Sequence, residues 1–133
     1  SVKKGVNGST IIDSSYNANP ASFESSINSL ISMNGRSWII LGEMGELGDK
    51  SEQYHCQIAK YAKEKGIEKI FITGKYQSSI ANVFGNNAFS FETVPELIAF
   101  VLPIIEEDVN ILIKASRFMR FETIVDALTK IKY

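Results

Sequence analysis

The sequence predicts an α/β fold with a Rossmann-like, doubly wound and mostly parallel sheet that carries helices on both faces. Two observations lead to this prediction. Apolar, β-rich segments alternate along the chain with segments of helical periodicity, which is the order of successive βαβ units. In addition, residues 38–41 and 70–72 are apolar at every position, as in strands that are covered on both faces. The crossovers between such strands are expected to be right-handed.

The expected elements follow in chain order. Strands are expected at residues 9–13, 37–41, 69–73, 88–91 and 110–114. Helices are expected at residues 21–33, 51–65 and 75–84, from Thr93 to about Pro103, and at about 120–130. Residues 1–8 are polar and contain glycine, so we expect them to be a lead-in from an upstream segment.

Local signals place the ends of these helices. Pro20 is suited to the first position of the first helix, and Gly66 to the residue that follows the second. Thr93 and Glu96 have the spacing of a capping box, and Pro103 is expected to end the helix that they open.

Composition limits the possible functions. The chain has 133 residues, 44% of them hydrophobic, and a net charge of −1, which suits one domain with a single core. Lys and Arg form no basic block, so no nucleic-acid partner is expected, and no apolar run reaches the ~20 residues of a membrane span. The single cysteine, Cys56, excludes an internal disulfide and favours a cytoplasmic location. No zinc-ligand spacing is present, so no metal site is expected.

The segment that joins the first two predicted elements has more hydrogen-bonding side chains than a turn requires. This segment, loop 13–20, reads Asp13-Ser14-Ser15-Tyr16-Asn17-Ala18-Asn19-Pro20. A turn needs one or two residues of this kind. Because open α/β sheets bind ligands at the carboxyl ends of strands, we expect the loop to present side chains to a ligand. The alternative is an Asx-rich turn in which Asn or Ser only caps the next helix.

A second loop is acidic and rich in glycine. This loop, loop 42–48, reads Gly42-Glu43-Met44-Gly45-Glu46-Leu47-Gly48 and does not have the spacing G-x-G-x-x-G. Glu43 and Glu46 would repel a pyrophosphate, so we exclude dinucleotide binding and expect the loop to face a positively charged substrate group. The alternative is a flexible glycine turn with solvated acids.

A third loop follows the last expected strand. This loop, loop 114–117, reads Lys114-Ala115-Ser116-Arg117. Arg117 can clamp a carboxylate or a phosphate with its planar fork, and Ser116 can add a hydroxyl or cap the final helix. The alternative for Arg117 is an ordinary surface arginine.

Two other features are weaker candidates for a functional role. Gly74 and Lys75 follow a strand, but Tyr76 stands where a P-loop requires Ser or Thr, so we exclude a P-loop. His55 shares a helix face with Ala59 and Ala62, which favours a buried, hydrogen-bonded structural histidine over a catalytic one.

The three loops and His55, taken in order, resemble one family, the C-terminal domain of the Mur ligases. The corresponding family motifs read D-D-S-Y-N-A-N-P, L-G-D/E-M-x-E-L-G and K-G-S-R-x-M-x-x-E, and the resemblance covers about residues 9 to 130. These motifs are those of the family member that adds D-alanyl-D-alanine to UDP-N-acetylmuramoyl-tripeptide. The chain departs from them at Ser14, where the family usually has a second Asp, and at Ala115, where it usually has Gly. Ala115 is compatible with the fold if its backbone φ is not positive.

The resemblance implies a part of an ATP-dependent ligase in which the tripeptide carboxylate is activated as an acyl phosphate and then attacked by the dipeptide amine. ATP and Mg²⁺ would be bound mainly by a central domain, and the UDP-sugar peptide by an N-terminal domain, neither of which is in this chain. This domain would receive D-alanyl-D-alanine and close over the central domain and ATP. It would contribute no catalytic residue and would be inactive alone.

The same resemblance implies a set of residues that bind substrate or ATP. They are Asp13, Tyr16, Asn17, Asn19, Pro20, Glu43, Glu46, Ser116 and Arg117. The charges agree with a zwitterionic dipeptide, since acidic side chains can attract its ammonium group and Arg117 can hold its carboxylate. Two other functions remain open from the sequence: a free-standing, flavodoxin-like ligand-binding module and a pure interaction domain.

Overall fold

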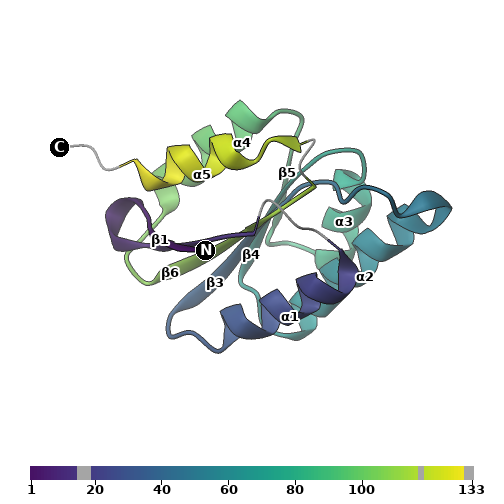
Figure 1. Cartoon of the computed structure of the whole chain (residues 1–133), viewed down its shortest axis with the longest axis horizontal. Coiled ribbons are helices and arrows are strands. Elements are labelled where there is room, and N and C mark those ends of the chain that lie inside the picture. The colour runs from purple at the N-terminus through teal and green to yellow at the C-terminus, as the bar shows by residue number, and fades with distance from the viewer. Residues whose placement is uncertain (15–18, 117–118, 131–133) are drawn as a thin grey trace.

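The computed structural model describes residues 1–14, 19–116 and 119–130, and in these ranges the chain alternates strands with helices (Figure 1). The elements, in chain order, are β1 (Val2–Lys4), β2 (Thr10–Asp13), α1 (Pro20–Ile31), β3 (Arg36–Leu41), α2 (Ser51–Glu64), β4 (Lys69–Thr73), α3 (Gln77–Phe84), β5 (Ala88–Phe91), α4 (Val94–Val101), β6 (Val109–Lys114) and α5 (Glu122–Thr129). Short 3-10 turns occur at η1 (Val6–Gly8), η2 (Gly48–Lys50) and η3 (Leu102–Ile104).

The strands form one sheet in the order β1-β2-β6-β3-β4-β5. All neighbouring pairs from β2 to β5 are parallel, which confirms the predicted sheet. The exception is β1, which pairs antiparallel with β2 and lies in the segment that we expected to be a lead-in. Its three residues are all exposed and have no apolar alternation, so the sequence carries little signal for this edge strand.

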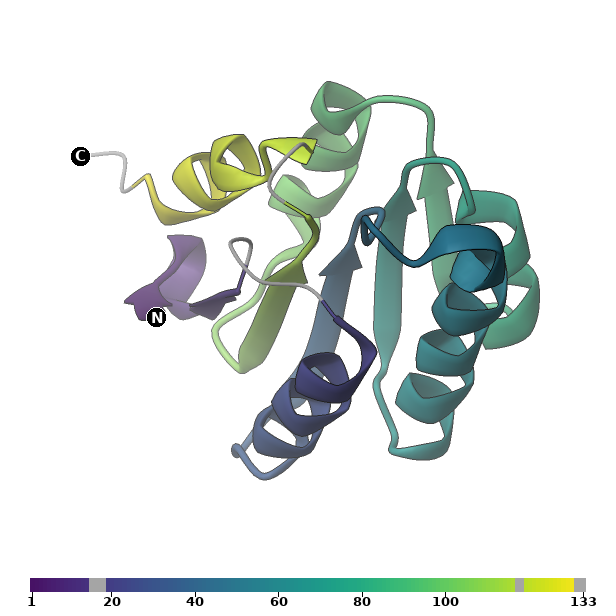
Figure 2. The same ribbon diagram turned by 45° about the vertical axis from the view of Figure 1, so that its right-hand side comes forward.

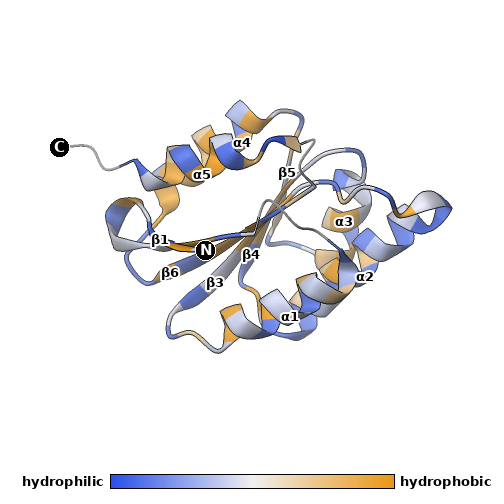
Figure 3. Cartoon of the chain, viewed as in Figure 1, coloured by the Kyte–Doolittle hydropathy of each residue, from blue (hydrophilic) through white to orange (hydrophobic). Residues whose placement is uncertain are grey.

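Helices cover both faces of the sheet, as predicted. Helices α1, α2 and α3 pack on one face, and α4 and α5 pack on the other (Figures 1 and 2). The central strand β3 is apolar on both sides, because Trp38 and Ile40 join the core under α4 and α5 while Ile39 and Leu41 join the core over α1, α2 and α3. The hydropathy colouring shows the same inward-facing apolar layers (Figure 3). Two hydrophobic layers therefore hold the sheet rigidly in the middle of the molecule.

The helix ends follow the predicted capping residues closely. The side-chain oxygen of Asn19 accepts a hydrogen bond from the N–H of Ser22 at 3.0 Å, and Pro20 is the first residue of α1. The hydroxyl of Thr93 accepts from the N–H of Glu96 at 3.3 Å and donates to its carboxylate at 2.8 Å. Helix α4 ends at Val101 and passes into η3, which contains Pro103.

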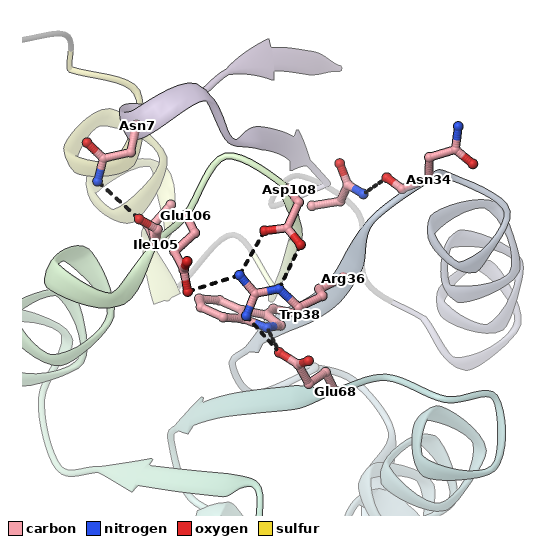
Figure 4. Close-up of polar contacts among 9 residues, drawn as sticks. Asn7, Asn34, Arg36, Trp38, Glu68, Ile105, Glu106 and Asp108 are labelled. Atoms are coloured by element: carbon pink, nitrogen blue, oxygen red, sulfur yellow. Dashed lines mark hydrogen bonds and ion pairs between the residues drawn. The ribbon is translucent and has the colours of Figure 1, made fainter.

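One ionic cluster joins three segments at the amino ends of β3 and β6 (Figure 4). The guanidinium of Arg36 binds both carboxylate oxygens of Asp108, at 3.0 and 2.8 Å, and also contacts Glu106 at 3.1 Å. The indole N–H of Trp38 donates to Glu68 at 2.7 Å, and Glu68 lies 3.6 Å from Arg36. The hydrogen bonds from Arg36 lower the pKa of Asp108 below its ordinary value. This cluster, the Arg36 cluster, lies at the sheet edge opposite to the three loops.

The topology places those loops at a switch point. After β6 the chain continues to α5 on one face, whereas after β2 and β3 it continues to α1 and α2 on the opposite face (Figure 2). Because β6 lies between β2 and β3, the connections diverge on both sides of it. Open α/β sheets bind ligands at such divergences, at the carboxyl ends of the strands.

Candidate functional site

The carboxyl ends of β2, β3 and β6 bring parts of the three predicted loops together. Strand β2 ends at Asp13, and the next N–H, that of Ser14, donates to the carbonyl of Ile113 in β6 at 3.0 Å. Beyond β3, the N–H of Gly42 donates to the carbonyl of Lys114 at 2.9 Å. The backbone therefore extends the sheet pairing into all three loops, as the parallel arrangement predicts.

Loop 42–48 and loop 114–117 are joined by hydrogen bonds around Ser116. The N–H of Ser116 donates to the carbonyl of Glu43 at 3.0 Å, and the hydroxyl of Ser116 accepts from the N–H of Gly45. Since the hydroxyl oxygen is the acceptor of this bond, its hydrogen can be donated to another group. Ser116 is thus fixed by two bonds and retains a donor at the edge of the sheet.

Gly42 permits the close approach of these two loops. A Cβ atom at this position would lie 2.7 Å from the Cβ of Ala115 and 2.5 Å from the ring of Phe121. Ala115 is fully buried and is not among the described residues with positive φ. The condition for an alanine at this position, a backbone φ that is not positive, is therefore met.

Glu43 and Glu46 have different surroundings. The carboxylate of Glu43 accepts a hydrogen bond from the backbone N–H of Lys75 at 3.2 Å, and its side chain is partly buried. Glu46 is exposed and has a φ of 61°, in the left-handed region that non-glycine residues rarely adopt. The structure thus fixes Glu43 within the edge and presents Glu46 to solvent.

The contact of Lys75 with Glu43 adds a fourth loop that the sequence did not predict. Gly74 and Lys75 follow β4, and Gly74 has a φ of 112° and lies against the side chains of Glu43 and Met119. From the sequence, these residues were of interest only as part of a P-loop, which Tyr76 excludes. Because they directly follow a parallel strand, their sequence position could have predicted that they lie beside the other three loops, at the carboxyl ends of the strands.

His55, in α2, connects loop 42–48 to the start of this helix through both nitrogens of its ring. The histidine is fully buried, its Nε2 accepts from the N–H of Met44 at 2.9 Å, and its Nδ1 lies 2.7 Å from the carbonyl of Ser51. This geometry requires a neutral ring that carries its hydrogen on Nδ1. Burial lowers the pKa of His55 below its ordinary value, and the Ser51 hydrogen bond and the charge of Glu43 oppose this effect only in part. The ring of Tyr76 packs against the imidazole with centroids 4.8 Å apart.

Loop 13–20 is described only at its two ends. Asp13 lies 3.9 Å from the ammonium of Lys3 in β1, so the unpredicted strand contacts this predicted site residue. Asn19 caps α1, and Pro20 forms its first turn. The predicted site residues Tyr16, Asn17 and Arg117 lie outside the described residues.

Other features lie away from these loops. A cavity of about 860 Å³ lies between η1 and α5, and its lining residues include none of the predicted site residues. Across residues 1–14, 19–116 and 119–130, no three His, Cys, Asp or Glu side chains are placed to share a metal ion. No helix in the same ranges is long and apolar enough to cross a membrane.

Comparisons with known proteins agree with this arrangement. The family model described as "Mur ligase, glutamate ligase domain" matches residues 1–117. The UDP-N-acetylmuramoyl-tripeptide--D-alanyl-D-alanine ligase of Escherichia coli (strain K12) is 34% identical over 119 residues, which are 89% of this chain and 26% of that protein. The crystal structure of MurF from Acinetobacter baumannii superimposes with a TM-score of 0.84 and 28% identity over 94% of this chain and 28% of that one.

A further solved structure shows the fold alone. The MurF ligase from Thermotoga maritima in complex with ADP has a TM-score of 0.80 and 22% identity, and covers 95% of this chain and 29% of that one. This chain spans about a quarter of the length of the Escherichia coli relative. The family model covers most of the residues, including all of loops 13–20 and 42–48 and loop 114–117. The chain therefore belongs to the Mur ligase family.

Proposed function

We propose that this chain is the C-terminal domain of an ATP-dependent ligase that adds D-alanyl-D-alanine to UDP-N-acetylmuramoyl-tripeptide. The main support is the 34% identity, across 89% of the chain, to a relative that bears this name. The arrangement of the loops adds physical support, because the described residues of the three loops meet at the carboxyl ends of the strands, where open α/β sheets bind ligands. Under this proposal the enzyme works in the cytoplasm in peptidoglycan synthesis.

The rest of the enzyme would supply what this domain lacks. We assign the UDP-sugar peptide to an N-terminal domain, and ATP, Mg²⁺ and the formation of the acyl phosphate to a central domain. The 133-residue domain would receive the dipeptide and close over the nucleotide, and we expect it to have no ligase activity alone. Closure excludes water, which would otherwise hydrolyse an acyl phosphate.

The dipeptide is a zwitterion, and the loops at the carboxyl ends of the strands have groups that can bind its ammonium and its carboxylate. Glu43 is already placed by the N–H of Lys75, so its carboxylate can accept a further bond from an ammonium group. The hydroxyl of Ser116 can donate to a carboxylate, because its oxygen receives the N–H of Gly45. We assign Arg117 as the second donor to that carboxylate, and Asp13, Tyr16, Asn17, Asn19, Pro20 and Glu46 to the remaining contacts with dipeptide or ATP.

The proposal is tested in the full-length ligase with Arg117→Ala. A charged hydrogen bond is worth about 1.5–3 kcal/mol, so the KM for D-alanyl-D-alanine should rise about tenfold or more while the KM for ATP stays unchanged. Arg120→Asn is the matched control, because it removes a nearby arginine and asparagine tolerates the φ of 52° at that position. Equal dipeptide KM values for wild type and Arg117→Ala would show that Arg117 does not bind the dipeptide.

A simpler observation tests the domain assignment. The reading frame upstream of Ser1 should encode a G-x-x-G-K-[ST] segment of a central ATPase domain. A stop codon directly before Ser1 would contradict the ligase proposal and would favour a free-standing binding module.

A further inference from the structure

Lys114 is a buried cation that the proposed contacts do not use. It is the last residue of β6 and only 3% exposed, although it lies at the edge where the loops converge. Its ammonium contacts the hydroxyl of Ser26 at 3.4 Å and lies 5.5 Å from the centre of the Phe23 ring, both in α1. In the described part of the chain, it forms no ion pair with a carboxylate.

The contacts of the Lys114 ammonium compensate only a small part of the cost of burying its charge. A buried ammonium normally has a carboxylate partner or several strong acceptors, because leaving water costs free energy that one long hydrogen bond does not return. The Phe23 ring provides only a weak attraction. Methionine would fill a similar volume in the same apolar layer without carrying a charge. The burial of Lys114 is therefore a cost that packing does not explain.

The adjacent helix adds to the positive potential instead of balancing it. Lys114 contacts the first two turns of α1, where the N–H groups give the helix its positive end. The first turn of α1 carries no acidic residue, although Glu24 follows in the second turn and Asp13 ends the neighbouring strand β2. The positive end of α1 and the ammonium of Lys114 therefore both favour an anion near the end of β6.

We propose that Lys114 acts as a positioning residue whose fixed positive charge attracts an anionic group, a carboxylate or a phosphate, to the carboxyl ends of β2 and β6. The inference rests on the proposed ligase function, which offers two such groups: the carboxylate of D-alanyl-D-alanine and the phosphates of ATP. Lys114 acts through its electrostatic field rather than by direct contact, since its side chain is only 3% exposed.

The test is Lys114→Met in the full-length ligase, with Lys60→Met as a control for loss of an exposed lysine. We expect the KM of the substrate whose anionic group is attracted, the dipeptide or ATP, to rise about tenfold in Lys114→Met and to stay at the wild-type value in Lys60→Met. A rise for the dipeptide identifies the carboxylate as the attracted group, and a rise for ATP identifies the phosphates. Thermal unfolding of the 133-residue chain should give an equal or higher Tm for Lys114→Met than for wild type.

Two results would overturn the inference. In the first, Lys114→Met has wild-type KM values for both the dipeptide and ATP. In the second, its Tm falls and only kcat declines, which is the behaviour of a purely structural residue. A wild-type enzyme that does not ligate D-alanyl-D-alanine would instead overturn the proposed function, so the two failures can be told apart.

Discussion

At the scale of single residues, His55 shows how a side chain outside loop 42–48 can set the shape of that loop. One imidazole accepts from Met44 in loop 42–48 and donates to the carbonyl of Ser51 at the start of α2. The sequence predicted a buried and hydrogen-bonded histidine from its helix face. It could not identify Met44 as the partner, because that contact depends on how β3 and α2 pack.

The neutral state of His55 makes the stability of the fold depend on pH. Because its pKa in the folded chain lies below the unfolded value of about 6.5, the unfolded chain binds the proton more readily. The free energy of unfolding should therefore fall as the pH drops below about 6.5, until the pH reaches the lower pKa of the folded state. Each unit of difference between the two pKa values corresponds to about 1.4 kcal/mol of stability lost.

Urea unfolding between about pH 7 and about pH 5 measures this effect. His55→Gln retains an oxygen that can accept from Met44 but does not titrate, so its stability should change less across this range. Asp108 cannot produce the same slope. Its pKa is lowered in the folded chain, so it changes the free energy of unfolding only at a pH near or below the ordinary pKa of an aspartate, which is more acidic than this range. Identical slopes for wild type and His55→Gln would show that His55 is not the titrating group.

At the scale of elements, most boundaries follow from local chemistry. The starts of α1 and α4 were predicted from Pro20 and from the pair Thr93 and Glu96, and the structure has these caps. The start of α3 was predicted two residues too early, at Lys75 instead of Gln77. The reason is tertiary: Gly74 has a φ of 112°, and the N–H of Lys75 binds Glu43, so this segment is held out of the helix.

The two caps allow stability and function to be separated. Asn19→Ala and Thr93→Ala each remove one side-chain cap, so each should lower the free energy of unfolding by about 1 kcal/mol. Asn19 is also a proposed ligand contact, whereas Thr93 lies at the carboxyl end of β5, outside the proposed site. In the full-length ligase, only Asn19→Ala should raise the KM for the dipeptide or ATP. Equal KM values in both variants would leave Asn19 with a capping role alone.

At the scale of the whole molecule, the parallel sheet explains why the meeting of the loop ends could be predicted. Loops that follow parallel strands must meet at one edge, so the convergence of loop 13–20, loop 42–48 and loop 114–117 follows from the predicted topology. The burial of Lys114 did not follow, because a terminal strand residue points to either face according to the register of β6 against β3. The antiparallel β1 and its contact with Asp13 were also missed, since three exposed residues have no readable pattern.

We expect ligand binding at the carboxyl ends of the parallel strands and a purely stabilising role at their amino ends, and the Arg36 cluster gives a test of this expectation. Arg36 joins the start of β3 to the segment before β6, far along the strands from the loops (Figure 4). Arg36→Met removes a two-pronged contact with Asp108 and leaves neighbouring carboxylates without their cation, so the free energy of unfolding should fall. Arg36→Lys keeps the charge but not the planar fork, so its free energy of unfolding should lie between those of wild type and Arg36→Met.

Urea unfolding of the 133-residue chain and kinetics of the full-length ligase, measured on the same variants, decide the question. We expect Arg36→Met to lose stability and to retain wild-type KM values for the dipeptide and ATP, because the loops are positioned by β3 and β6 themselves and by His55. A tenfold rise in the dipeptide KM would mean that the Arg36 cluster sets the register of β3 against β6 and, through it, the geometry of Ser116. In that case the amino edge would share in substrate binding, and the division between a stabilising edge and a binding edge would be wrong.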